Sequence, residues 1–97
     1  MPAAYVISQV EVIDPEAYER YKAGTPAAVA AYGGEFVVRG GNVEVLEGEP
    51  PLGRVIMTKF PSMEQALAFY HSEEYADLLK IRLASTECRR FIVEGVD

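Results

Sequence analysis

The chain has 97 residues, of which 49% are hydrophobic and 25% charged, and its net charge is −6. This ordinary globular balance argues against disorder, and the longest apolar runs are far shorter than the roughly 18 to 20 residues of a membrane-spanning helix. The 15 acidic residues outnumber the 9 basic ones, which form no run longer than Arg89-Arg90, so binding to nucleic acid is disfavoured.

The length predicts one domain over residues 1–97. A domain of this size buries only about 60 to 65% of the surface that its unfolded chain exposes, so its core is marginal when alone. The first residues, 1–5, lack the basic segment and apolar stretch of a secretion signal, and we therefore expect a cytoplasmic location. Cys88 is the single cysteine and has no partner for an intramolecular disulfide.

Residues 4–13 are predicted to form the first strand. Its even positions, such as Val6 and Val10, are apolar, and its odd positions include Tyr5 and Ile7. A strand with one face in water should alternate between apolar and polar residues, so both faces of this strand need a cover. So short a chain can hardly supply two covers, and a partner subunit is the simplest second one.

Asp14-Pro15-Glu16 is a strong helix start, because Asp caps free amides and Pro suits the first helical position. Tyr18, Tyr21 and Tyr32 then recur at helical spacing. Gly24 and Pro26 interrupt the run, which predicts a kinked helix or two short helices with Thr25 capping the second. The tyrosine stripe is interpreted either as core with hydrated hydroxyl tips or as the lining of a ligand site.

The rest of the chain is organised around the stretch from Ala31 to Gly41, where two glycine pairs bracket a short apolar run. It predicts the end of the helix and a strand over residues 35–39, parallel to the first strand because a helical crossover separates them. Residues 42–47 alternate and predict a strand continuation or hairpin arm. Residues 48–53 are a turn, and residues 54–60 form the third strand.

A second helix starts at residues 61–65, where Ser62 and Gln65 have capping-box spacing. Around His71 the helix breaks, and Ser72 caps a further helix whose apolar stripe includes Tyr75 and Leu78. Residues 90–96 are the last strand. The predicted fold is therefore α+β and ferredoxin-like, with the order βαββαβ and a four-stranded antiparallel sheet that carries its helices on one face and leaves the other bare.

An ordered series of motifs then resembles the family known as domain of unknown function 1330, from about Tyr5 to Val96. The motifs are DPEAYERY, AYGGEFVVRGG, VEVLEGE, FPSMEQALAFYHSEEYADLLKIRLAS and FIVEG. Where such relatives commonly have a proline after the serine of the last helix start, this chain has Glu73. Both residues suit a first helical turn, so the difference leaves the resemblance intact.

The resemblance implies a dimeric α+β barrel, in which two ferredoxin-like sheets pack face to face. A homodimer would also cover the bare sheet face. The wider superfamily includes cofactor-independent monooxygenases, lactone isomerases, haem-binding enzymes and plain ligand-binding domains. The fold therefore does not select a function, and the site must be argued from residues.

His71 and Arg39 are the candidate catalytic residues. His71 is the only histidine, and its side chain is the one that most easily acts as a base near pH 7. Arg39 ends an apolar strand and is suited to hold a carboxylate or a developing anion. The alternatives are a histidine that satisfies carbonyls at a helix end and an arginine in a salt bridge to Glu35, Glu44 or a partner chain.

The favoured function is that of a homodimeric protein that binds a small organic molecule between sheet and helices, with Tyr18, Tyr21 and Tyr75 as ligand-binding residues. No cofactor is expected, and no metal site, since there is neither a second histidine nor a spaced Cys/His pair. The alternative is a cofactor-independent monooxygenase or isomerase that acts on a phenol, quinol or lactone, with His71 as base.

Overall fold

The computed structural model describes residues 2–96. In chain order they form β1 (Ala4–Val12), α1 (Pro15–Ala31), β2 (Glu35–Arg39), β3 (Arg54–Phe60), α2 (Met63–Tyr70), α3 (Glu73–Ser85) and β4 (Thr86–Glu94). Within these residues, no helix combines the length and the apolarity needed to cross a bilayer.

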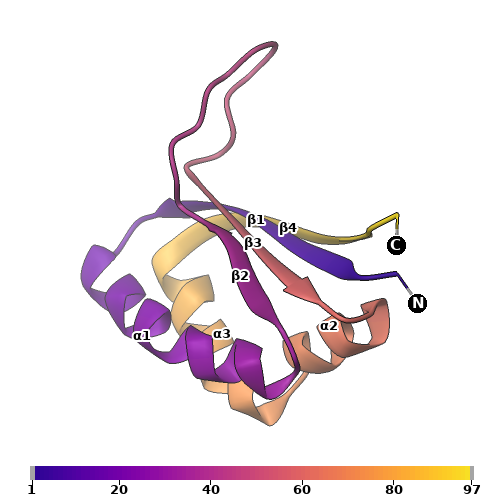
Figure 1. The fold of residues 1–97 in the computed structure, drawn as a ribbon. Coiled ribbons are helices and arrows are strands. Elements are labelled where there is room, and N and C mark those ends of the chain that lie inside the picture. Colours follow the sequence, from indigo (N-terminus) through magenta and orange to yellow (C-terminus); the bar gives the residue numbers. More distant parts are fainter. Residues whose placement is uncertain (1, 97) are drawn as a thin grey trace.

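The four strands form one antiparallel sheet in the order β2-β3-β1-β4. β1 and β2 run in the same direction and are separated by β3, which is the split arrangement that defines a ferredoxin-like sheet. All three helices lie on one face of this sheet (Figure 1). The α+β class and the ferredoxin-like topology predicted from the sequence are confirmed.

The two faces of the sheet differ in burial. The inward positions of β1, Ala4, Val6, Ser8 and Val10, are buried, whereas the outward positions alternate with them and are partly exposed. Phe91 lies opposite Ile7 on the outer face and is 50% exposed. The helices cover only the inner face (Figure 1), so the apolar side chains of the outer face have no cover within residues 2–96.

Helix α1 begins as expected, with the Asp14 carboxylate accepting a hydrogen bond from the Ala17 amide at 3.2 Å. Of the two alternatives predicted around Pro26, the division into two helices is wrong, because α1 runs as one helix from Pro15 to Ala31. Pro26 cannot donate to the Lys22 carbonyl, but the Thr25 hydroxyl donates to that carbonyl at 3.3 Å. The helix therefore tolerates its proline because another donor satisfies the freed acceptor.

Helices α2 and α3 are separated at His71, as predicted. The Ser62 hydroxyl accepts a hydrogen bond from the Gln65 amide at 3.1 Å, and the Ser72 hydroxyl accepts one from the Tyr75 amide at 3.2 Å. Each helix therefore starts at a serine cap. The restart at Ser72 turns Tyr75 inward, where it is fully buried.

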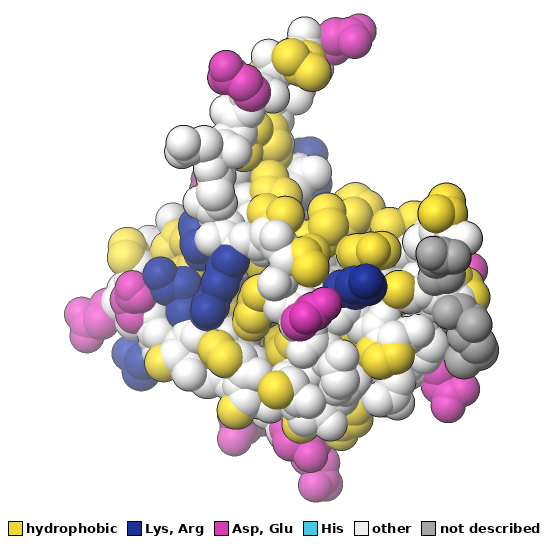
Figure 2. Space-filling view, in the orientation of Figure 1, with side chains coloured by type: hydrophobic (Ala, Val, Ile, Leu, Met, Phe, Trp, Pro, Cys, Tyr) yellow, Lys and Arg dark blue, Asp and Glu magenta, His cyan; other side chains and the backbone are white. Residues whose placement is uncertain are grey.

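Two segments differ from the sequence prediction. Residues 42–47 do not form the strand continuation, which is one of the two predicted alternatives. As in the other alternative, they belong to a hairpin: with the rest of residues 40–53 they make a long exposed hairpin, here called the arm, that projects from the sheet (Figures 1 and 2). The last strand begins at Thr86 rather than Arg90. The Thr86 hydroxyl donates to the Arg82 carbonyl at 2.7 Å, so the chain passes from helix to strand without a loop.

A chain of aromatic rings runs through the core. Phe60 packs on Phe69 at 5.1 Å between ring centroids, and Phe69 packs on Tyr75 at 4.5 Å. The series continues to Tyr21 at 6.2 Å and from there to Tyr18 at 5.6 Å. The rings thus lead from the centre of the molecule to the space between α1 and the sheet.

Candidate functional site

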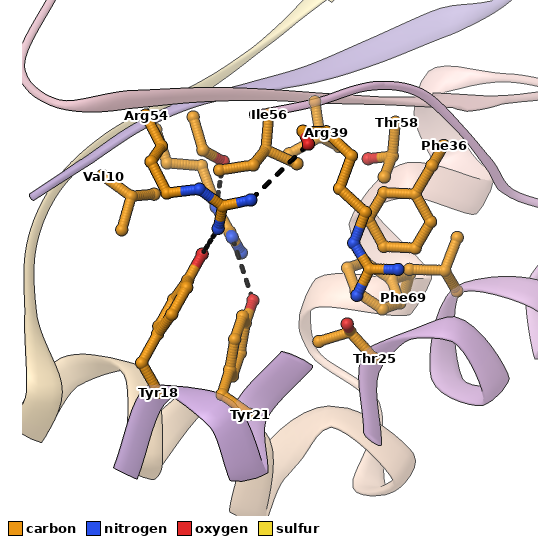
Figure 3. Close-up of a pocket in the computed structure, with 14 residues that line it drawn as sticks. Val10, Tyr18, Tyr21, Thr25, Phe36, Arg39, Arg54, Ile56, Thr58 and Phe69 are labelled. Atoms are coloured by element: carbon orange, nitrogen blue, oxygen red, sulfur yellow. Dashed lines mark hydrogen bonds between the residues drawn. The ribbon is translucent and has the colours of Figure 1, made fainter. Parts of the chain in front are cut away.

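A cavity lies between the inner face of the sheet and α1 (Figure 3). About 30 Å³ of it is open to the centre of a water-sized sphere, which is room for a small polar group. Its apolar lining is Val6, Val10, Val29, Phe36, Ile56 and Phe69. Its polar lining contains hydroxyls of Ser8, Tyr18, Tyr21, Thr25 and Thr58 together with three arginines.

The three arginines come from three different strands, Arg39 from β2, Arg54 from β3 and Arg90 from β4. Arg54 donates through Nη1 to the Tyr18 hydroxyl at 2.9 Å, and through Nη2 to the Arg39 carbonyl at 3.5 Å. In Figure 3, Arg39 and Arg54 lie on either side of the cavity, with Tyr18, Tyr21 and Thr25 of α1 facing them. Figure 2 shows a group of Lys and Arg side chains on the surface below the arm.

The orientation of Arg39 follows from the proline in α1. Its Nη2 donates at 2.9 Å to the Lys22 carbonyl, which is the acceptor that Pro26 leaves without its helical partner. The guanidinium also stacks on Phe36, with 4.4 Å from its carbon to the ring centroid. Its Nε and Nη1 groups make no hydrogen bond within residues 2–96, so they are free to bind a ligand.

Arg90 is the innermost of the three and is held by three hydroxyls. It donates to Ser8 at 2.8 Å, to Tyr75 at 2.6 Å and to Tyr21 at 3.1 Å. Arg82, which is only 3% exposed, donates to the same Tyr75 oxygen at 3.3 Å. Two guanidinium groups therefore share one phenol oxygen in the interior.

These contacts fix the direction of the Tyr21 proton. The Tyr75 oxygen has two lone pairs, and both face guanidinium donors, so its own proton must serve the 2.7 Å bond to the Tyr21 oxygen. The Tyr21 oxygen then accepts from Tyr75 and from Arg90. The Tyr21 hydroxyl is left to donate its proton into the cavity that it lines.

The protonation states of Tyr21 and Arg90 set the charge of the cavity. Burial raises the pKa of the Tyr21 phenol well above its ordinary value of 10.0, and the positive charge of Arg90 offsets only part of that rise. The pKa of Arg90 is raised as well: burial alone would lower it, but the adjacent Tyr21 and Tyr75 oxygens favour the charged form. Near neutral pH the cavity therefore presents a cation and a neutral hydroxyl donor.

Within residues 2–96, no carboxylate neutralises the positive charge of this site. Among residues 2–96 the one ion pair joins Lys22 to Glu19, at 3.1 Å on the surface of α1. None of Arg39, Arg54, Arg82 and Arg90 contacts a carboxylate there. Removing guanidinium groups from water without an acid is costly, so an anion is the ligand that this arrangement favours.

His71 lies outside the arginine cavity. It is exposed at the end of α2, where its backbone amide donates to the Leu67 carbonyl at 3.1 Å, and its ring packs edge-on against Tyr70. It lines a wider and more open groove, of about 410 Å³, that follows α2 and the edge strand β4. Arg90 borders both the groove and the cavity.

The structure brings together part of the set named from the sequence. Arg39, Tyr18 and Tyr21 line the cavity; Tyr75 lies behind it, joined to Tyr21 and Arg90. Arg54 and Arg90 were missed. The structure begins β4 at Thr86, whereas the sequence prediction began this strand at Arg90. With the earlier start, the alternation of side chains places Arg90 on the inner face, together with Cys88 and Ile92.

A model of the family described as "Domain of unknown function (DUF1330)" matches residues 3–96. No curated protein matches the chain. Among residues 2–96 there is no group of three or more histidine, cysteine, aspartate or glutamate side chains placed to hold a metal ion.

Solved structures share the fold at low sequence identity. A protein of unknown function from Rhodopseudomonas palustris, RPA0582, is 18% identical with a TM-score of 0.78, over 99% of this chain and 84% of that one. SnoaB, a cofactor-independent oxygenase from Streptomyces nogalater, is 11% identical with a TM-score of 0.64, over 100% and 96%. A putative antibiotic biosynthesis monooxygenase from Nitrosomonas europaea is 11% identical with a TM-score of 0.58, over 99% and 93%. At these identities the likeness concerns the fold alone.

Proposed function

Because this chain belongs to the DUF1330 family, whose description assigns no activity, we propose a function from the cavity itself: the protein binds a small organic anion between its sheet and α1. The observation that carries the proposal is the convergence of Arg39, Arg54 and Arg90 without a carboxylate partner in residues 2–96. The apolar lining favours a ligand with a hydrocarbon body, and the guanidinium groups favour a carboxylate or phenolate on it.

Short carboxylic acids are expected to raise the melting temperature of the wild-type protein, because a ligand that binds only the native state stabilises it. Neutral lactones of similar size should have no such effect. In Arg54→Gln the affinity for the acid should fall about tenfold or more, the usual consequence of losing a charge-assisted hydrogen bond. A thermal-shift titration followed by calorimetry measures both effects.

Arg20→Gln is the matched control, because Arg20 is exposed on α1 and does not line the cavity. The substitution removes the same positive charge as Arg54→Gln. It should bind the acid as the wild type does. Equal losses in the two variants would mean that overall charge, rather than the cavity, attracts the acid. If no acid in the panel shifts the melting temperature, the proposal is wrong.

We also propose that the protein forms a homodimer, in which the outer faces of two sheets pack together. Phe91 and Val93 are 50% and 45% exposed on this face, beside Ile7 and Tyr5 in the register, and a second sheet would cover them. Light scattering is expected to give twice the chain mass of 10.7 kDa. Phe91→Glu should yield a folded monomer; a wild-type monomer at micromolar concentration contradicts the pairing.

A second candidate is a cofactor-independent oxygenase or isomerase that acts on a phenol, quinol or lactone. The shared fold with SnoaB favours it. In this mechanism His71 removes the substrate proton and Arg39 holds the anion that results. Because His71 borders the open groove rather than the cavity, the substrate would have to extend past Arg90. We expect oxygen uptake or isomerisation that is lost in His71→Ala; identical rates in the variant argue against this role.

A further inference from the structure

The cavity holds more positive charge than one carboxylate neutralises. Arg39, Arg54 and Arg90 line it, and Arg82 lies directly behind Tyr75, with no acid in contact with any of them among residues 2–96. A ligand with a single negative charge would leave most of this charge uncompensated in a partly dehydrated space. The charge therefore favours a ligand with more than one anionic group.

The sheet register places two of these arginines at opposite ends of one row. Arg39 lies opposite Ile56, Ile56 opposite Ser8, and Ser8 opposite Arg90. These residues cross all four strands, and with strands about 4.8 Å apart the outer two backbones are about 14 Å from each other. The cavity lies over the middle of the row, on Ile56 and Ser8.

Each end of the row is oriented by its own contacts. At the β2 end, the Lys22 carbonyl and the Phe36 ring hold Arg39 and leave its Nε and Nη1 available. At the β4 end, Ser8 and Tyr75 hold Arg90, and the Tyr21 hydroxyl presents its proton to the cavity. The two donor groups thus belong to the two ends of the row, with Ile56 and Ser8 between them.

We propose that the ligand is a short dicarboxylate, with one carboxylate at Arg39 and the other at the Arg90 and Tyr21 end. Arg54 also lines the cavity and adds a third positive charge. This inference rests on the proposed anion-binding function and specifies its ligand class. Because only about 30 Å³ of the cavity is open to the centre of a water-sized sphere, even a short dicarboxylate such as malonate, succinate or glutarate has to displace side chains of the lining, and longer ones are excluded. Inorganic phosphate carries its charge on one centre and cannot reach both ends.

Calorimetric titration with succinate, succinamate, butyrate and inorganic phosphate tests the proposal. Succinamate has the length of succinate but replaces one carboxylate by a neutral amide. Succinate should bind at least about tenfold more tightly than succinamate, because one charge-assisted contact is lost in the latter. Phosphate should bind more weakly than succinate.

Two variants separate the ends of the row. Arg39→Gln changes an exposed side chain. Tyr21→Phe removes only a hydroxyl, at the cost of one hydrogen-bond partner for Arg90 and one for Tyr75. In each, the affinities for succinate and succinamate should become nearly equal. Arg20→Gln should preserve the difference, as a control for net charge. Circular dichroism verifies that the variants are folded.

Equal binding of succinate and succinamate by the wild-type protein would overturn the proposal and leave the simpler anion site intact. Tighter binding of phosphate than of succinate would also overturn it. A difference between succinate and succinamate that persists in both Arg39→Gln and Tyr21→Phe would show that the second carboxylate lies elsewhere. Failure of every acid, butyrate included, would refute the anion site itself.

Discussion

Tyr75→Phe is expected to lower the free energy of unfolding by about 2 to 4 kcal/mol, although it removes a single oxygen atom. That oxygen accepts hydrogen bonds from Arg82 and Arg90 and is joined to the Tyr21 hydroxyl. Without it, two buried guanidinium groups lose an acceptor that phenylalanine cannot replace. Chemical denaturation measures the loss.

Tyr32→Phe is the control for this change, because the Tyr32 hydroxyl donates to Glu74 at the surface. Its free energy of unfolding should stay close to that of the wild type. If the two variants are equally stable, the Tyr75 hydroxyl is not the acceptor on which the inner arginines depend. In that case the hydrogen bond to Ser8 would be the contact that orients Arg90.

Phe60→Ala should cost about 3 to 5 kcal/mol of unfolding free energy, the range measured for buried phenylalanines. Phe60 is 0% exposed, and its ring packs on Phe69. The backbone of Gly34 approaches so closely that a Cβ there would lie 2.6 Å from the Phe60 ring. The tight fit leaves the surroundings little freedom to close over the space that alanine would leave.

Leu83→Ala provides the comparison, since Leu83 is 63% exposed on α3. We expect it to lose about 0.5 kcal/mol or less. Thermal and chemical denaturation of both variants measure the difference. A loss below about 2 kcal/mol for Phe60→Ala would mean that the core around Gly34 and Phe69 collapses more freely than its packing suggests.

The elements that the sequence defines best are those with a residue-level start and stop. The strand at residues 35–39 is bracketed by glycine pairs, and both helix restarts follow a serine whose hydroxyl caps the next amides. These signals act within a few residues, so they need no knowledge of the rest of the fold.

The errors arose where a distant residue decides the outcome. Pro26 stays within one helix because Thr25 and Arg39 donate to the carbonyl that it frees, and Arg39 is 17 residues away from that carbonyl. Residues 42–47 alternate like a strand but find no strand to pair with. Arg90 makes the start of β4 look polar, although its contacts with Ser8, Tyr21 and Tyr75 make that position an inner one.

The same limit applies to the site. Tyr18, Tyr21 and Arg39 could be named because periodicity and strand ends mark them. Arg54 and Arg90 could not, because their nearness depends on β1 lying between β3 and β4, where Val10 pairs with both Arg54 and Cys88. The ferredoxin-like strand order was predicted, but the residue-by-residue register that brings these two side chains together depends on how three strands align.

The arm divides the chain into two interlocked halves. β1, α1 and β2 precede it, while β3, α2, α3 and β4 follow it, yet β1 lies in the sheet between β3 and β4. Each half alone would therefore leave strand edges unpaired that the other half fills. A cut within residues 41–50, all of them exposed, would leave two fragments whose reassociation rebuilds both the sheet and the arginine cavity, with Arg39 supplied by one fragment and Arg54 and Arg90 by the other. Neither half of the chain therefore forms the sheet or the arginine cavity without the other.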